Sequence, residues 1–224
     1  MTMLRMALFD FDGTLCDSVA SIIRLTQLAC ARAEVAIPDE GTIRQQIGAG
    51  LFDAGMVYAK GDTAKAQMIF DGYRAEAKRQ YAMKDKPLDP LFEGVRAGLQ
   101  TLADDGWLIA IVTNKGRHGL NAMLDAHALT SLIDVSFTAD DVPVKPAPDM
   151  ALAAIDHFGV IPEDAVLIGD TVNDALCASN AKIAFVGVGW GYHDDDVLRS
   201  HGARHIAKDM PDLLDSLNEL VRGE

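Results

Sequence analysis

Short apolar runs without polar interruption are the feature of this sequence that most restricts its fold. A strand with one face in solvent alternates apolar and polar residues, whereas a strand covered on both faces is apolar throughout. Continuous runs therefore predict strands of a parallel sheet with helices on both sides. Four such runs occur: Met6–Phe9, Leu108–Val112, Ala165–Ile168 and Ile183–Val186.

The segments around these runs have apolar residues three or four positions apart, the spacing of one helix face. Strand and helix thus alternate along the chain. This alternation predicts an α/β fold with a Rossmann-like, doubly wound parallel sheet as its core. The expected helical faces are Val95 with Leu99 and Leu102, Leu120 with Met123 and Leu124, Leu152 with Ile155, and Leu213 with Leu217 and Leu220.

Residues 17–87 break the alternation, because they contain no run typical of a strand. We predict that they form a helical domain inserted after the first strand, and that residues 1–16 and 88–224 together form the core. The stretches Lys84–Pro87 and Asp89-Pro90 mark its far end. Its expected helical faces are Val19, Ile22, Ile23 and Cys30, and then Met68, Ile69, Tyr73, Ala77 and Tyr81.

Two carboxylates, Asp10 and Asp12, follow the first apolar run and precede a Gly-Thr turn. Ligands collect at the carboxyl ends of parallel strands, so this is the edge of the sheet where a site is expected. Side chains two positions apart in an extended segment point to the same side. The pair suits a nucleophile and an acid/base partner. An EF-hand loop is excluded, because it needs glycine at its sixth position and Gly13 stands fourth.

Further polar residues meet the same edge from later parts of the chain. Thr113 and Asn114 follow the second run, Asp170 and Asp174 follow the third, and Lys145 precedes the third. Carboxylate oxygens favour Mg²⁺ over zinc, so Asp170 and Asp174 are candidates to bind or orient a divalent cation. The Lys145 ammonium would neutralise a bound phosphoryl group.

The net charge of −13 makes nucleic acids and anionic membranes unfavourable partners. It also repels an anionic substrate. A site for a phosphate ester therefore needs concentrated positive charge from a metal ion, a lysine or a helix N-terminus. The acidic groups Asp140-Asp141 and Asp194–Asp196 are expected to be a solvated loop and a helix N-terminus, outside any site.

The expected cellular location is inferred from the cysteines and from the length of the apolar stretches. Three cysteines without CxxC spacing argue against disulfides and structural zinc, so a reducing cytoplasm is expected. The apolar run within Met1–Leu8 is too short for a signal peptide, and no apolar stretch reaches the length of about 18 residues that a membrane helix needs.

These residues resemble, over the whole chain, the four ordered motifs of the haloacid dehalogenase-like hydrolase superfamily, with its phosphoglycolate phosphatase-like branch the nearest match. Asp10–Thr14 matches the first motif, Thr113-Asn114 the second and Lys145-Pro146 the third. Gly169-Asp170 with Asp174 matches the fourth. The resemblance implies hydrolysis of a small phosphorylated metabolite, with phosphoglycolate as the leading candidate.

The resemblance also implies a role for each matched residue. Asp10 would attack phosphorus, and Asp12 would protonate the leaving oxygen and later activate water. Thr113 and Lys145 would hold the phosphoryl oxygens, with Asn114 beside them in the substrate site.

A metal site follows from the same motifs. The family binds Mg²⁺ on the residues that correspond to Asp10, Asp170 and the backbone carbonyl of Asp12. Asp174 would then brace a metal-bound water or Lys145.

The helical insert resembles the cap that closes over the site in this family. Within it, Ile47–Leu51 looks like the loop that meets the substrate. A Gly-x-Gly turn lets backbone amides approach a ligand, so Gly48 and Gly50 are candidate substrate contacts, and Arg44 is a candidate partner for a carboxylate.

Rival interpretations remain open from the sequence. A dehalogenase would lack an acid at Asp12, and a phosphonate hydrolase would need a cap lysine, for which Lys60 is loosely placed. A sugar-phosphate mutase is not distinguished. A non-catalytic binding protein that keeps the fold would not need Asp10 and Asp12 together. The sequence does not indicate the oligomeric state.

Overall fold

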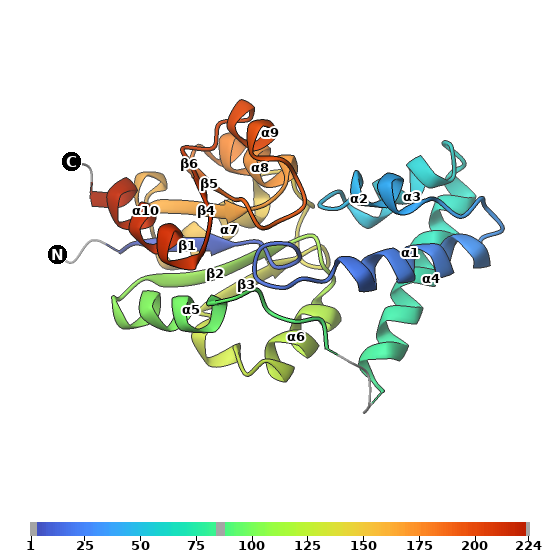
Figure 1. Ribbon diagram of the computed structural model, residues 1–224, viewed down its shortest axis with the longest axis horizontal. Coiled ribbons are helices and arrows are strands. Elements are labelled where there is room, and N and C mark those ends of the chain that lie inside the picture. Colours follow the sequence, from blue (N-terminus) through green and yellow to red (C-terminus); the bar gives the residue numbers. More distant parts are fainter. Residues whose placement is uncertain (1–3, 84–87, 223–224) are drawn as a thin grey trace.

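The computed structural model describes residues 4–83 and 88–222. At its centre lies a six-stranded sheet in the order β3-β2-β1-β4-β5-β6, in which every adjacent pair is parallel (Figure 1). The predicted fold class and all four predicted strands are confirmed. The strands are β1 (Met6–Phe9), β2 (Leu108–Thr113), β3 (Val135–Thr138), β4 (Ala165–Gly169), β5 (Ala184–Val188) and β6 (His205–Ala207).

Two strands, β3 and β6, were not predicted. β3 lies at one edge of the sheet, where Val135, Ser136 and Phe137 are only partly buried, so its sequence is not a continuous apolar run. β6 lies at the other edge and is three residues long. Edge strands are covered less completely than central ones, and this weakens the apolar pattern on which the prediction depended.

Helices cover both faces of the sheet, and each face has its own core. One core joins Phe9 and Ile111 to α5, α6 and α10, and the other joins Leu8 and Leu167 to α7, α8 and α9. Successive strand residues point to opposite faces, which explains why each run is apolar throughout. The helices are α5 (Val95–Asp104), α6 (Arg117–Ala126), α7 (Asp149–Phe158), α8 (Val172–Ala181), α9 (Asp195–Ser200) and α10 (Met210–Arg222), with 3-10 turns η1 (Thr130–Leu132) and η2 (Pro162–Asp164).

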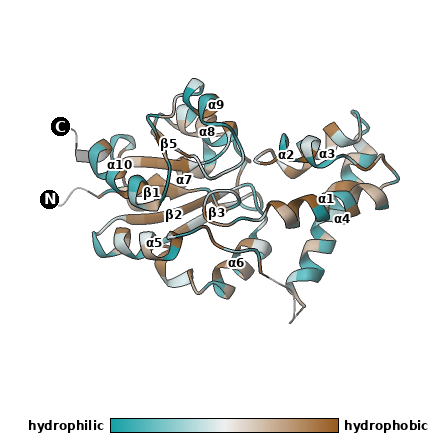
Figure 2. Cartoon of the chain, in the orientation of Figure 1, coloured by the Kyte–Doolittle hydropathy of each residue, from teal (hydrophilic) through white to brown (hydrophobic). Residues whose placement is uncertain are grey.

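The expected apolar face of α7 was partly wrong. Ile155 is buried, but Leu152 is 37% exposed. The buried face consists of Met150, Ala151, Ala154 and Ile155. Small alanines let this helix pack closely on the sheet, and a pattern of large apolar residues does not detect such a face. Figure 2 shows the hydrophobic strands at the centre of the molecule.

Residues 19–81 form four helices, which we call the helical block: α1 (Val19–Arg32), α2 (Glu40–Arg44), α3 (Leu51–Tyr58) and α4 (Thr63–Tyr81). Its own small core includes Ala29, Cys30, Ala66 and Ile69. Met68, expected on the buried face of α4, is 50% exposed. The predicted boundary at Lys84–Pro87 lies outside the described residues. None of the described helices is long and apolar enough to cross a membrane.

The two connections between the sheet and the helical block run side by side. Cys16 and Leu91 form an antiparallel bridge. Asp17 N donates to Pro90 O at 2.8 Å, and Phe92 N donates to Leu15 O at 3.1 Å. The block projects beyond the carboxyl ends of the strands (Figure 1), so it stands next to the edge where the candidate site residues lie.

Candidate active site

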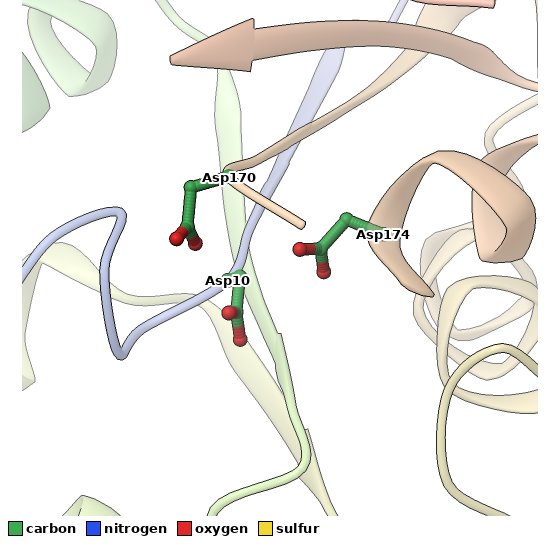
Figure 3. Close-up of side chains that lie close together, drawn as sticks. All are labelled: Asp10, Asp170 and Asp174. Carbon is green, nitrogen blue, oxygen red and sulfur yellow. The ribbon is translucent and has the colours of Figure 1, made fainter. Parts of the chain in front are cut away.

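Three carboxylates meet at the carboxyl ends of β1 and β4. Asp10 directly follows β1, Asp170 directly follows β4, and Asp174 lies in the first turn of α8. Each offers an oxygen within 4.8 Å of the others (Figure 3). Asp10 is 4% exposed, and Asp170 and Asp174 are fully buried. The two strands are neighbours in the sheet, which is why residues 160 positions apart in the chain lie together.

Hydrogen bonds hold Asp170 in place. Its Oδ1 accepts from Thr14 Oγ1 at 3.0 Å, and its Oδ2 accepts from Tyr192 N at 2.9 Å. Gly13 packs against the same carboxylate with φ +88, and a Cβ there would lie 2.3 Å from Asp170 Oδ2. The Gly-Thr turn after β1 is therefore required both by the backbone conformation and by the close approach to Asp170.

Asp174 is held more tightly than the other two carboxylates. Its Oδ2 accepts from Thr171 N at 3.0 Å and from Thr171 Oγ1 at 2.6 Å. Its Oδ1 accepts from Lys145 Nζ at 2.5 Å. With three hydrogen bonds, Asp174 fixes both the start of α8 and the lysine.

Lys145 brings a buried ammonium to this cluster. Its side chain is 2% exposed, and Nζ lies 2.8 Å from Asp10 Oδ1 and donates to Val112 O at 2.9 Å. Burial acts to lower the pKa of Lys145, but the Asp10 and Asp174 carboxylates outweigh it and raise that pKa above its usual value. Lys145 therefore stays charged at neutral pH.

The cluster has more negative than positive groups. Burial raises the pKa of Asp10 to about 6, Lys145 opposes this shift, and Asp174 adds to it. Burial and the Asp174 and Asp10 carboxylates also raise the pKa of Asp170 well above its usual value. Asp10 Oδ1 accepts no hydrogen bond of good geometry from the described residues. Three carboxylates against one ammonium leave an excess of negative charge, and such an oxygen-only set can hold a divalent cation.

Asp12 lies apart from the cluster and faces a second lysine. Lys115 Nζ donates to both carboxylate oxygens, at 2.8 and 3.0 Å, and Ser18 Oγ donates to Oδ1 at 2.7 Å. Burial acts to lower the pKa of Lys115, but Asp12 raises it well above its usual value. Neither Lys115 nor Ser18 was predicted from the sequence as a site residue. The position of Lys115 just after the second strand was the available signal.

Thr113 is the last residue of β2, and Asn114 directly follows it. Thr113 is buried, and its Oγ1 accepts from Lys115 N at 3.2 Å. Asn114 uses its whole amide group: Oδ1 accepts from Lys145 N at 2.8 Å, while Nδ2 donates to Lys145 O at 3.1 Å and to Gly48 O at 3.0 Å. Asn114 therefore orients the lysine and joins the helical block to the core.

A cavity of about 450 Å³ lies between the core and the helical block. Most of the predicted site residues line it or lie at its floor. Asp170 and Asp174 are buried behind the floor, next to Asp10. The lining includes Asp10, Asp12, Thr113, Asn114 and Lys145 from the core, and Gly48 and Gly50 from the block.

Arg44 does not join this group. It is exposed on α2 and lines a separate depression with Val19 and Arg24. Lys60, the candidate cap lysine of a phosphonate hydrolase, is exposed at the end of α3 and is not among the cavity residues. Asp140 lies in a turn, as predicted, but it borders the cavity and pairs with Arg74 of α4 at 2.6 Å. The contact between Arg74 and Asp140 could not be predicted from the sequence, because the two residues are far apart along the chain.

Gly48 brings the helical block against the core. Its φ is +90, and a Cβ there would lie 2.6 Å from Thr171 Cγ2. Only glycine fits both this backbone conformation and this close contact. The turn that contains Gly48 and Gly50 therefore reaches the edge of the sheet at Thr171, the residue that follows Asp170.

Comparison with known proteins gives a family match over most of the chain. A family model described as haloacid dehalogenase-like hydrolase matches residues 7–188. A phosphoglycolate phosphatase of Nitrosococcus oceani is 31% identical over 221 residues, which cover 96% of this chain and 94% of that protein. Pyrophosphatase PpaX of Halalkalibacterium halodurans is 30% identical over 216 residues, which cover 96% of this chain and 97% of that protein.

A solved structure has the same architecture. A hydrolase from Pseudomonas syringae matches with a TM-score of 0.82 at 27% identity, over 96% of this chain and 98% of that one. Sequence and structure comparisons thus confirm the family that the motifs resembled.

Proposed function

The chain belongs to the haloacid dehalogenase-like hydrolase family, and on this premise we propose that it is a Mg²⁺-dependent phosphatase that uses Asp10 as its nucleophile. The observation that carries the proposal is the position of Asp10. Its buried carboxylate lies at the floor of the cavity, beside the Lys145 ammonium and next to Asp170, while Asp12 faces the same cavity.

Hydrolysis then takes two steps. An Asp10 oxygen bonds to phosphorus while the bond from phosphorus to the leaving oxygen breaks, and Asp12 gives its proton to that oxygen. In the second step Asp12 takes a proton from water, the water oxygen bonds to phosphorus, and the bond to Asp10 breaks. The hydrogen bonds from Lys115 and Ser18 hold Asp12 in place for both transfers.

The site fits a divalent cation. Asp10 and Asp170 would hold Mg²⁺ with the backbone carbonyl of Asp12, because the Asp174 oxygens already accept three hydrogen bonds. When bound, the cation supplies positive charge to the phosphoryl oxygens and to the excess of buried carboxylates. Asp174 acts through Lys145, whose ammonium it fixes at 2.5 Å.

The remaining groups position the phosphoryl group and exclude water. Thr113 and Lys145 lie at the floor of the cavity and would hold the phosphoryl oxygens. We assign the helical block as a cap that covers this floor, with residues 1–16 and 88–224 as the catalytic core. Positioning and charge stabilisation of this kind provide most of the catalysis in phosphoryl transfer.

The substrate in this proposal is a small phosphate monoester. Relatives named phosphoglycolate phosphatase and pyrophosphatase share transfer of a phosphoryl group to water but differ in the leaving group. Phosphoglycolate is the candidate that the resemblance of the motifs suggests.

The test follows phosphate release from p-nitrophenyl phosphate with Mg²⁺ and with excess chelator. We expect activity only with Mg²⁺, a phosphoryl group on Asp10 after acid quench, and a loss of about a thousandfold or more in Asp10→Asn. Asp156→Asn, an exposed acid on α7, is the control and should keep wild-type activity. Full turnover in chelator or in Asp10→Asn would refute the mechanism. Transfer to a sugar phosphate without phosphate release would indicate a mutase.

A further inference from the structure

We infer that the substrate's leaving group is a bulky apolar group, aromatic or branched, rather than a small anion such as glycolate. This inference rests on the proposed function, because it concerns the part of the ester that extends from the phosphoryl group into the cavity. It starts from the apolar wall of that cavity. The side chains of this wall are Ile22, Leu25, Ile43, Ile47 and Phe70, all from the helical block.

The five side chains differ in burial: Ile22 and Phe70 are partly buried, whereas the other three are almost fully buried. Among the described residues, none of them belongs to the two cores of the sheet or to the core of the helical block. Leu25, Ile43 and Ile47 are at most 6% exposed. Protein atoms therefore cover these three, and the uncovered apolar surface of the wall belongs mainly to Ile22 and Phe70, where a ligand of matching chemistry would cover it.

The size of the cavity supports a bulky leaving group. Its volume of about 450 Å³ lies within the range of roughly 300–1,000 Å³ that holds drug-sized ligands. A phosphoryl group at the floor, beside Asp10 and Thr113, leaves most of this space under the apolar wall. A two-carbon leaving group would leave the wall uncovered.

The charged groups of the cavity are mostly engaged. Arg74 pairs with Asp140 at 2.6 Å, Lys115 pairs with Asp12, and Lys145 pairs with Asp10 and Asp174. Lys78 is the remaining lysine or arginine of the described lining with no ion pair, and it is exposed to solvent. A carboxylate on the leaving group would thus compete with existing ion pairs or remain in water, whereas an apolar group meets no such competition.

The experiment compares ethyl phosphate, 2-phenylethyl phosphate and phosphoglycolate, all esters of primary alcohols. We expect kcat/KM for 2-phenylethyl phosphate to exceed that for the other two by about tenfold or more, because a phenyl ring covers the apolar wall. Preference for phosphoglycolate, or equal rates for all three, would overturn the inference and leave the phosphatase proposal intact. Absence of hydrolysis for every ester, with p-nitrophenyl phosphate included, would overturn both.

Variants of the wall residues test which side chains select the leaving group. Phe70→Ala and Ile22→Ala should each reduce the ratio of kcat/KM between 2-phenylethyl and ethyl phosphate by about fivefold or more. Met68→Ala is the matched control, because Met68 lies on the same helix as Phe70 but is 50% exposed and not among the cavity residues. An equal ratio in all three variants and the wild type would show that this wall does not select the leaving group.

Discussion

The side-chain amide of Asn114 joins the end of β2 to the helical block by donating a hydrogen bond to Gly48 O at 3.0 Å. The same amide also binds the backbone of Lys145 on both sides. One residue therefore couples the position of the helical block to the position of the ammonium beside Asp10. This coupling links closure of the proposed cap to the geometry of the reacting groups.

The first prediction concerns this coupling. Asn114→Ala removes three hydrogen bonds, each worth about 1 kcal/mol, and should lower kcat/KM by about tenfold or more. Amide hydrogen exchange in residues 47–50 should become faster, since the turn loses its anchor on the core. Asn180→Ala is the control, because Asn180 donates to Pro146 O at an exposed site. Unchanged exchange in residues 47–50 would contradict the coupling.

The second prediction separates backbone strain from contact at two glycines with nearly the same conformation. Gly48 has φ +90 and Gly61 has φ +87, but nothing lies within 4 Å of a Cβ at Gly61. Backbone strain alone should lower the free energy of unfolding of Gly61→Ala by about 1–2 kcal/mol, and Gly48→Ala should lose at least as much because its methyl group also meets Thr171. Only Gly48→Ala should lower kcat/KM, because its methyl group meets Thr171. Similar kinetics in the two variants would show that the close contact at Gly48 has no functional role.

The third prediction is a pH effect on stability in the absence of metal. The pKa of Asp10 is raised from 3.8 to about 6, so the folded state binds this proton more tightly than the unfolded chain. Its contribution to stability is full below pH 3.8 and is lost as the pH rises through about 6. Asp10→Asn should therefore become more stable relative to the wild type by about 1–3 kcal/mol between pH 4 and pH 7.5.

Urea unfolding in excess chelator at several pH values measures this difference. Asp156→Asn should show no such trend, because its side chain is exposed on α7. If the stability difference between Asp10→Asn and the wild type did not change with pH, then ionisation of Asp10 would not oppose folding.

The fourth prediction concerns Glu76, which ties α4 to α1. This carboxylate is 2% exposed and accepts hydrogen bonds from Arg79, Gln80 and Arg32, in that order of effect, and these lower its pKa to about 2. The contribution of ionised Glu76 to the stability of the folded state is therefore full above pH 4.5 and is lost as the pH falls toward 2.

Glu76→Gln should lower the free energy of unfolding by about 1–3 kcal/mol at pH 7, because the arginines lose a charged acceptor. The loss should be smaller near pH 2, because Glu76 itself is partly protonated there. Asp71→Asn is the control, since Asp71 is exposed on the same helix and accepts only from Gln67 among the described residues. A thermal or urea unfolding series at both pH values checks the effect. Equal losses at pH 7 and pH 2 would exclude the charged acceptor as the cause.

The central strands were predictable because their environment is uniform. β1, β2, β4 and β5 are buried on both faces, so each reads as a continuous apolar run. The edge strands β3 and β6 were missed, as was the alanine-rich face of α7. In these elements burial depends on neighbours that the local sequence does not specify.

The sequence alone determined the fold class, because the alternation of strand and helix is a local property. It also determined the edge of the sheet where Asp10, Asp12 and Asp170 lie, because the acids at the strand ends and the Gly-Thr turn are local features too. Their positions follow because the carboxyl ends of parallel strands share one edge. Only the tertiary structure decided which residues of the helical block reach that edge. Gly48 arrives there and Arg44 does not, although four positions separate them, because the direction of α2 is set by packing between segments distant in sequence. The same packing pairs Lys115 with Asp12 and Arg74 with Asp140, and no spacing along the chain encodes such contacts.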